Sequence, residues 1–286
     1  MVFSGMIAAI LLPVHIDNRL QNEPLYIFVY SGRTHKRRMR MLKKICLAML
    51  AVMMTANVAL AERTIVFAHD ATWPPMEYMS ADKKVVGYAV DYMDAVAKEA
   101  GFTAEHRNVA WDGIFAGLAN GEYDAIASSV SITEQRKRAM DFSIPYFEVK
   151  QAVVLNKSVE AKSFADLKGK TLGAQIGTTG YFAIKKAEGV TPRSFDEIGL
   201  AMEALYNGNI DGVVCDDPVA ANYALQQEEY AKRLKIAFIV EAEEKEYYGV
   251  AVNKGNSEVL ALINKGIKAV KEKGIEEQLR KKWIGQ

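Results

Sequence analysis

The sequence lacks the short motifs that mark many nucleotide-dependent and hydrolytic enzymes. It contains no Gly-x-Gly-x-x-Gly turn, no Gly-x-x-x-x-Gly-Lys phosphate loop and no Gly-x-Ser-x-Gly nucleophile elbow. Because no motif supports catalysis, we expect neither an enzyme nor a bound cofactor.

Histidine and cysteine are scarce. After residue 61 the only histidines are His69 and His106, and neither has the spacing of a metal ligand. Cys215 is the only cysteine in the same part of the chain, so it cannot form a disulfide there. We expect no metal site, and we interpret Cys215 as a small buried hydrophobic residue.

The chain also lacks a strong charge of either sign. Its 36 Lys and Arg nearly balance 35 Asp and Glu, but eight basic and only two acidic residues fall within residues 1–61. Residues 62–286 therefore carry a net charge of −5. A mildly acidic body gives no support for a nucleic-acid partner, and we expect none.

The first 61 residues have the pattern of an export signal. Two lysines at 43–44 precede an apolar stretch at 45–54, and Ala-Leu-Ala before residue 62 has the small residues of a cleavage site. The stretch is too short for a comfortable membrane-spanning helix. We expect a start at Met41, with residues 1–40 as an upstream extension. Cleavage after Ala61 would then release a periplasmic protein.

Strand-like and helix-like patterns alternate from Thr64 onward. Runs of β-branched and apolar residues predict strands, and apolar residues spaced three and four apart predict helices. The predicted strands are 64–68, 123–127, 148–155, 172–175, 212–214, 234–239 and 248–253. The predicted helices are 90–100, 181–186, 197–206, 259–271 and 274–283, with a helix end at 115–118. This order indicates an α/β fold with largely parallel sheets.

One segment repeats at an offset of 87 residues. Residues 118–126 match residues 205–213, and each copy predicts a helix that ends at Asn-Gly and leads into a buried strand. We interpret the repeat as two similar lobes. Ligands of open α/β sheets bind beyond the carboxyl ends of strands. Ser128 and Ser129 follow the strand in one copy, and Asp216, which is equivalent to Ser129, follows it in the other.

Residues 128–136 contain groups that suit the carboxylate of an amino acid. A carboxylate is bound well by a bidentate guanidinium together with hydroxyl and backbone N–H donors. The segment offers the hydroxyls of Ser128, Ser129 and Ser131 and the guanidinium of Arg136. A solvated Arg136 and ordinary turn serines are the alternatives.

Two threonines add to this set. Thr133 is placed to cap a short helix that carries Arg136. Thr179 lies in the strand-to-helix turn 177–180, where it can donate to a carboxylate, and we also expect it to cap the following helix.

Asp216 and two tryptophans suit the rest of an amino acid. An ammonium group requires a carboxylate, and Asp216 lies just past a predicted buried strand, although a helix cap is its alternative role. Trp73 in a Trp-Pro-Pro turn and Trp111 at a helix start can supply flat walls. Each tryptophan alone is more often a packing residue.

These segments together resemble the polar amino-acid-binding proteins of bacterial ABC transporters, solute-binding protein family 3. The resemblance rests on residues 69–78, 86–91, 111–114, 128–136, 141–146, 166–173, 211–220 and 248–252. It implies the two-lobed, type II periplasmic-binding-protein fold. The lobes would be 62–148 with 248–286, and 149–247, joined by crossing segments near 147–153 and 246–250.

The resemblance also implies how a ligand is held. The carboxylate would be held by Arg136, Ser129, Ser131 and Thr179, and the ammonium group by Asp216 and Ser129. Trp73 and Trp111 would flank the side chain, with Asp70 near its far end. With Ser128, these residues form the predicted ligand site. The family more often has Tyr or Phe at the aromatic positions, so the two tryptophans leave the pocket's preference open.

The implied partners are a free L-amino acid and an inner-membrane ABC permease. Ligand binding would close the lobes about the two crossing segments, and we expect a monomer. Asp70 sets the predicted ligand preference, because a cationic or amide group would relieve the cost of burying its carboxylate. Cation–π attraction to the tryptophans acts in the same direction. We therefore predict arginine, lysine or ornithine first and glutamine or histidine next. If Asp70 only caps its turn, the tryptophans form an apolar pocket instead.

Two other functions are alternatives to amino-acid binding for transport. An enzyme resembling cyclohexadienyl dehydratase would need a proton-transferring acid in the cleft, and Asp216 qualifies only if no ammonium group engages it. A receptor's sensor domain is not expected, because no membrane helix or signalling domain appears up to Gln286.

Overall fold

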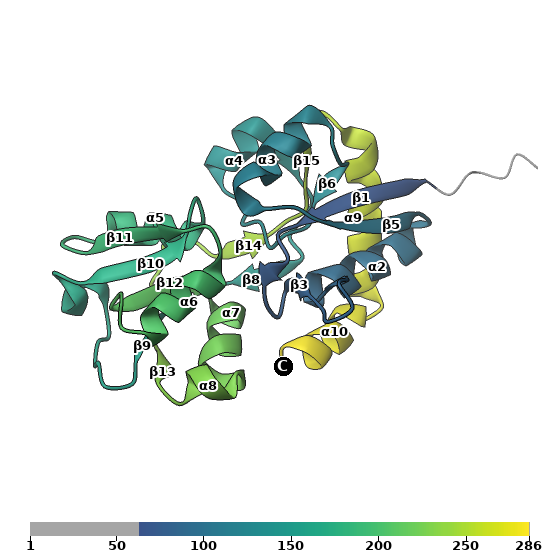
Figure 1. The fold of residues 1–286 in the computed structure, drawn as a ribbon. Coiled ribbons are helices and arrows are strands. Elements are labelled where there is room, and N and C mark those ends of the chain that lie inside the picture. The colour runs from purple at the N-terminus through teal and green to yellow at the C-terminus, as the bar shows by residue number, and fades with distance from the viewer. Residues whose placement is uncertain (1–62, 286) are drawn as a thin grey trace, which may run out of the picture. The chain divides into compact units, whose positions relative to one another are not determined.

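The computed structural model describes residues 63–285 (Figure 1). The predicted start at Met41, export signal and cleavage after Ala61 lie outside these residues. Two five-stranded sheets organise the described part of the chain.

The first sheet has the strand order β5-β1-β6-β15-β7. Its strands are β5 (Thr103–Asn108), β1 (Thr64–His69), β6 (Ala125–Ile126), β15 (Ala251–Asn253) and β7 (Met140–Phe142). β1 is parallel to β5 and β6, whereas β15 is antiparallel to β6 and β7.

The second sheet has the strand order β11-β10-β12-β9-β13. Its strands are β11 (Thr191–Phe195), β10 (Thr171–Gln175), β12 (Gly212–Asp216), β9 (Gln151–Asn156) and β13 (Leu234–Ile239). β10 is parallel to β11 and β12, whereas β9 is antiparallel to β12 and β13.

The two sheets have the same plan, and β6 of one corresponds to β12 of the other. This agrees with the repeat that the sequence shows at an offset of 87 residues. The expectation of largely parallel sheets was wrong, because half of each sheet is antiparallel. The antiparallel half of each sheet contains the strand that follows a crossing segment, which is β15 in the first sheet and β9 in the second. An antiparallel strand can be reached without the helical crossover that a parallel strand needs.

Helices cover both sheets, as the alternating pattern predicted. They are α2 (Tyr88–Ala100), α3 (Trp111–Asn120), α4 (Glu134–Ala139), α5 (Thr179–Lys186), α6 (Ile198–Tyr206), α7 (Asp217–Ala221), α8 (Glu228–Ala231), α9 (Ser257–Glu272) and α10 (Ile275–Trp283). Shorter elements are the 3₁₀ turn η1 (Phe164–Leu167), the π-helical turn η2 (Asn222–Gln226), and the small sheet of β2 (Thr72–Trp73), β3 (Glu77–Met79) and β4 (Val85–Val86). None of the helices within residues 63–285 is long and apolar enough to cross a membrane.

The repeated Asn-Gly ends of α3 and α6 have the same backbone. Gly121 and Gly208 each have a φ of 75°, in the left-handed region. A glycine adopts this conformation without the steric cost that a Cβ would add, so the helix stops and the chain turns into the next strand.

Two short strands connect the sheets. β8 (Phe147–Val149) leads from the first sheet into β9, and β14 (Glu246–Tyr248) leads from β13 back to β15. They pair antiparallel to each other, with Phe147 opposite Tyr248 (Figure 1). The continuous strands expected at 148–155 and 248–253 are therefore each broken where the chain leaves this crossing ladder and joins a sheet. The lobe limits 62–148 with 248–286, and 149–247, stay a prediction.

The core fills the space between helices and sheets. α9 buries Val259, Ile263, Ile267 and Val270, which recur at three- and four-residue spacing as one face of a helix requires. Cys215 in β12 is 1% exposed, in agreement with its interpretation as a buried residue.

Candidate functional site

All nine residues predicted for the ligand site line one small inner cavity. Its lining consists of Asp70, Trp73, Glu77, Trp111, Ser128, Ser129, Ser131, Arg136, Gln175, Thr178, Thr179 and Asp216. The cavity has a volume of about 20 Å³, which has room for about one water molecule. The sequence interpretation missed Glu77, Gln175 and Thr178.

Asp70 follows β1 and is held on several sides. Its backbone N–H donates to the Ser128 hydroxyl at 2.7 Å, and its carboxylate accepts from Thr72 at 2.9 Å. Gln175, from the second sheet, also donates to the carboxylate at 2.7 Å. Burial raises the pKa of Asp70. Asp70 therefore braces its own turn and also faces the cavity.

Ser128 and Ser129 bind a buried carboxyl group. Ser129 has a φ of 47°, a conformation that is uncommon for a residue with a Cβ. This backbone directs its hydroxyl to Glu77 at 3.0 Å, and the hydroxyl of Ser128 also donates to Glu77. Glu77 is fully buried, and burial raises its pKa well above the usual range of a glutamate.

Arg136 projects from α4 between the two sheets. Thr133 caps the helix as predicted, since its hydroxyl accepts from the Arg136 backbone N–H. The guanidinium donates to the carbonyl of Ser131 at 2.9 Å and to that of Gly177 at 3.2 Å. Burial lowers the pKa of Arg136 to about 10, an effect opposed by the charges of Glu246 and Asp216. Arg136 is therefore not an ordinary solvated arginine.

The two tryptophans are oriented by their N–H groups. Trp73 donates to Asp216 at 3.2 Å, and Trp111 donates to the carbonyl of Ile176 at 2.8 Å. Trp111 also lies under the Arg136 guanidinium, 5.5 Å from ring centroid to Cζ. Each tryptophan thus links the two sheets in addition to lining the cavity.

Asp216 ends β12 and begins α7 without capping it, since its side chain makes no cap hydrogen bond. The carboxylate instead accepts from Trp73, from Gln151 at 2.5 Å and from the Tyr248 hydroxyl. Burial raises the pKa of Asp216, and the nearby charge of Glu246 raises it further. The group is 5% exposed and faces the cavity.

The helix cap expected at Thr179 was misplaced by one residue. The hydroxyl of Thr178 accepts from the Tyr181 N–H and caps α5. Thr179 is the first helical residue, and its hydroxyl donates to Glu246 at 2.6 Å. α5 comes this close to the cavity because Gly180 has no Cβ, which would lie 2.8 Å from the Gln151 side-chain oxygen and 2.9 Å from the Val214 carbonyl.

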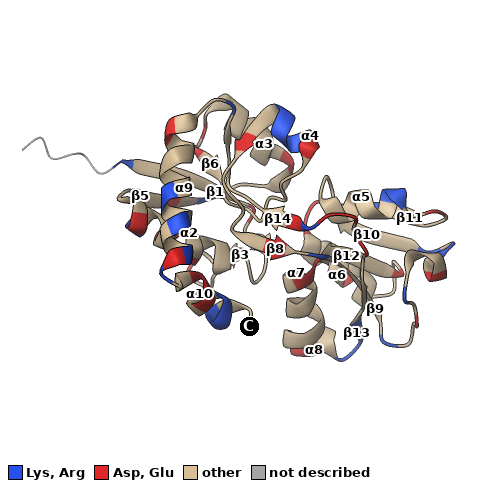
Figure 2. Ribbon diagram, turned by 180° about the vertical axis from the view of Figure 1, so that it is seen from behind, with Lys and Arg blue, Asp and Glu red and all other residues tan. Residues whose placement is uncertain are grey.

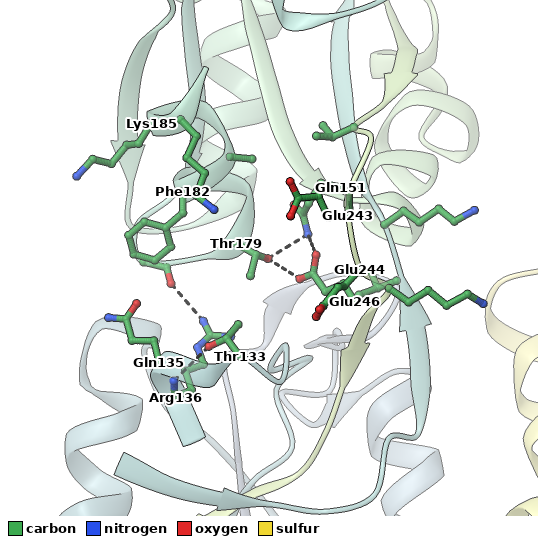
Figure 3. A pocket seen from close by; sticks show the side chains of 18 of the residues that line it. Thr133, Gln135, Arg136, Gln151, Thr179, Phe182, Lys185, Glu243, Glu244 and Glu246 are labelled. Atoms are coloured by element: carbon green, nitrogen blue, oxygen red, sulfur yellow. Dashed lines mark hydrogen bonds between the residues drawn. The ribbon is translucent and has the colours of Figure 1, made fainter. Parts of the chain in front are cut away.

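A larger outer hollow of about 1510 Å³ adjoins the inner cavity. Thr179 lines both spaces, and Gln151 and Glu246 of the outer hollow join it through the hydrogen bonds that Figure 3 shows. The segment that enters β14 carries several acidic residues along this hollow (Figure 2). Within residues 63–285, no group of His, Cys, Asp and Glu side chains is arranged to hold a metal ion.

Known proteins identify the family. The sequence profile described as "Bacterial extracellular solute-binding proteins, family 3" matches residues 65–286. The chain belongs to this family. The resemblance inferred from the sequence is thereby confirmed.

Curated relatives of this solute-binding protein are named as binding proteins and not as enzymes. A probable histidine-binding protein of Neisseria gonorrhoeae is 34% identical over 77% of this chain and 82% of its own length. ABC transporter arginine-binding protein 1 of Escherichia coli K12 is 32% identical over 86% of this chain and its whole length. L-cystine-binding protein TcyJ of the same strain is 29% identical over 78% of this chain and 83% of its own length. These names confirm the expectation of a binding protein.

Solved structures agree on the fold. An ancestral arginine-binding protein bound to glutamine has a TM-score of 0.72 and 39% identity, covering 78% of this chain and 98% of its own. An ancestral arginine-binding protein bound to arginine has a TM-score of 0.72 and 38% identity, covering 77% of this chain and 97% of its own. The predicted α/β, two-lobed fold is confirmed.

Proposed function

We propose that this solute-binding protein captures a polar L-amino acid, preferably a cationic one, in the periplasm and delivers it to an inner-membrane ABC permease. The observation that carries the proposal is the charge of the inner cavity. Its lining contains three acidic side chains, Asp70, Glu77 and Asp216, and one basic side chain, Arg136.

A cationic amino acid fits this distribution of charge. Its α-carboxylate would pair with Arg136, and its α-ammonium group with Asp216, as two charge-assisted contacts. Glu77 is fully buried, and its carboxyl group already accepts hydrogen bonds from the hydroxyls of Ser128 and Ser129. Asp70 is then the acidic group left for the ligand's side chain, and a cation there relieves the cost of its burial.

The relatives support a polar ligand. Their names include arginine, histidine and cystine, and ancestral arginine-binding proteins have been solved with glutamine and with arginine. The proposed order is therefore arginine, lysine and ornithine first, then glutamine or histidine. The family profile describes extracellular proteins, which together with the export pattern at 43–61 supports a periplasmic location.

Calorimetry with individual amino acids, on wild type and on Asp70→Asn, tests this proposal. We expect wild type to bind arginine more tightly than glutamine, and leucine least. The substitution should weaken the binding of arginine by at least about tenfold, since it removes a charge partner. The binding of glutamine should weaken much less. The exposed Asp82→Asn is the matched control and should change neither. Tight leucine binding by wild type, or an unchanged ranking in Asp70→Asn, would contradict the proposal.

The dehydratase alternative needs Asp216 as a proton donor to substrate. In the structure its carboxylate accepts hydrogen bonds from Trp73, Gln151 and Tyr248, which suits a fixed carboxylate for an ammonium group. A turnover assay with prephenate and arogenate separates the two functions, and we expect no turnover.

A further inference from the structure

Two polar side chains at the connections between the sheets lie beside the inner cavity, in the lining of the outer hollow. Gln151 is the first residue of β9, two positions after the end of the crossing strand β8, and Glu246 is the first residue of the crossing strand β14. Both point toward Thr179 at the start of α5 (Figure 3). Neither belongs to the predicted ligand site.

Glu246 engages the groups that the proposed function assigns to a ligand carboxylate. Its carboxylate accepts from the hydroxyls of Ser131 and Thr179, at 2.6 Å from the latter. Its charge also acts on Arg136, where it is the larger of two charges that favour the guanidinium cation. A carboxylate of the protein itself thus holds the donors expected for the ligand.

Gln151 engages the group assigned to the ligand ammonium. Its amide nitrogen donates to Asp216 at 2.5 Å and to Glu246 at 3.1 Å. The opposite amide orientation would place the oxygen against the Asp216 carboxylate, so the donor must face this way. Its oxygen is buried without a hydrogen-bond partner in the described part of the chain. A buried acceptor without a partner is unfavourable, so this arrangement of Gln151 carries a cost that its displacement would relieve.

We propose that Glu246 and Gln151 form an internal substitute for the α-carboxylate and α-amino group of the ligand, and that ligand entry displaces them. The inference rests on the proposed function, because it uses the roles of Arg136 and Asp216 given there. The inner cavity of about 20 Å³ has no room for an amino acid, so ligand entry must displace side chains beside it.

The substitute has a physical purpose when no ligand is bound. Arg136 and Asp216 are buried charges, and a buried charge without a partner is strongly destabilising. Glu246 and Gln151 supply those partners from within the chain. The ligand must compete with them, so its affinity is lower than the contacts of Arg136 and Asp216 alone would give.

The test compares L-arginine with agmatine, which is arginine without its α-carboxylate, by calorimetry on wild type, Glu246→Gln and Glu246→Ala. The control is Glu244→Gln, which removes the same charge two residues away from an exposed side chain outside this hydrogen-bond network. We expect both Glu246 variants to bind arginine more tightly, by about tenfold for Glu246→Ala. The affinity for agmatine should not rise, because agmatine has no α-carboxylate that would compete with the carboxylate of Glu246. Thermal unfolding of each variant verifies that it is folded.

The outcomes separate this inference from the proposed function. If wild type binds arginine but the Glu246 variants bind it equally or more weakly, Glu246 is not a competitor and the inference is wrong. An equal gain for agmatine and arginine would also overturn it, since the competition would not be with the carboxylate. If wild type binds no amino acid, the proposed function fails and the inference fails with it.

Discussion

The two five-stranded sheets have one strand plan but contribute unequally to the cavity between them. Eight of the twelve lining residues follow strands of the first sheet or belong to its connections, and four come from the second. The first side supplies the aromatic walls, the serines and Arg136. The second side supplies Asp216 and the start of α5. A shared topology therefore fixes where side chains meet, and the residue types decide what they bind.

The clearest contrast is between the ends of β6 and β12. Ser129 and Asp216 are equivalent by the 87-residue offset, yet Ser129 has a φ of 47° and Asp216 has a φ of −61°. The hydroxyl of Ser129 donates to the buried Glu77, whereas the carboxylate of Asp216 accepts from three donors. Equivalent backbone positions have thus acquired different chemistry.

Removal of the guanidinium on the first side should have the largest effect. We expect Arg136→Ala to weaken amino-acid binding by at least about thirtyfold, because truncating one partner of a desolvated charge pair costs about 2–5 kcal/mol. Calorimetry measures the change. Arg138→Ala, on the exposed side of the same short helix, serves as the control and should bind as wild type. Binding of Arg136→Ala within threefold of wild type would remove Arg136 from the site.

Removal of the Asp216 carboxylate on the second side should have the second-largest effect on ligand affinity. We expect Asp216→Asn to weaken binding by about ten- to a hundredfold, less than Arg136→Ala because the amide still accepts a hydrogen bond. Glu203→Gln, exposed on α6 of the same side, is the control. A loss larger than that of Arg136→Ala would reverse the proposed imbalance between the two sides.

The raised pKa of Asp216 predicts how binding changes with pH. Burial and the charge of Glu246 raise this pKa to about 7 in the free protein, and a bound ammonium group would lower it. Binding then expels a proton below about pH 7, so affinity should fall by up to tenfold per pH unit on acidification. Calorimetry from pH 8 to pH 5 measures the profile, and Asp216→Asn should flatten it. An affinity that rises toward acid pH would contradict the assignment.

The smallest effects are expected where the two sides are alike. Gly121→Ala and Gly208→Ala each place a Cβ on a residue with a φ of 75°, with no other atom within 4 Å of it. Each should lower the free energy of unfolding by about 1–2 kcal/mol and leave ligand affinity unchanged. Denaturant unfolding measures both, and similar losses would show that the repeat is structural. If only one of the two substitutions lowered the free energy of unfolding, the two glycines would not be structurally equivalent.

The sequence predicted which residues lie together at the inner cavity better than it predicted the sheets. Residues after β1, β6 and β12 were expected at a common edge because parallel strands end together, and the structure brings them to one cavity. β5 and β11 were missed because they are edge strands with polar sequences, TAEHRN and TPRSF, that lack apolar alternation. Edge strands form by pairing with a neighbour, which a local pattern does not record.

The missed cavity residues differ in how visible they were. Residues 68–72 and 174–178 are also similar and align Gln175 with His69, so the place of Gln175 at the end of a strand could have been used. Glu77 lies within residues 69–78, which are part of the family resemblance. The pattern of apolar residues around it did not indicate that it is buried. Gln151 and Glu246 meet only because β8 and β14 cross between the sheets. No local signal joins residues 95 positions apart.

The crossing ladder has a consequence for the order in which the chain can fold. Every strand of the second sheet lies within the continuous stretch 151–239, so that sheet can be completed as soon as this stretch has been synthesised. The first sheet must wait for β15, which joins β6 across 125 positions as Ala251 pairs with Ile126. Because contacts between distant residues form slowly, the middle of the chain is expected to become a folded unit first. The half of the molecule that begins the chain would then be finished last.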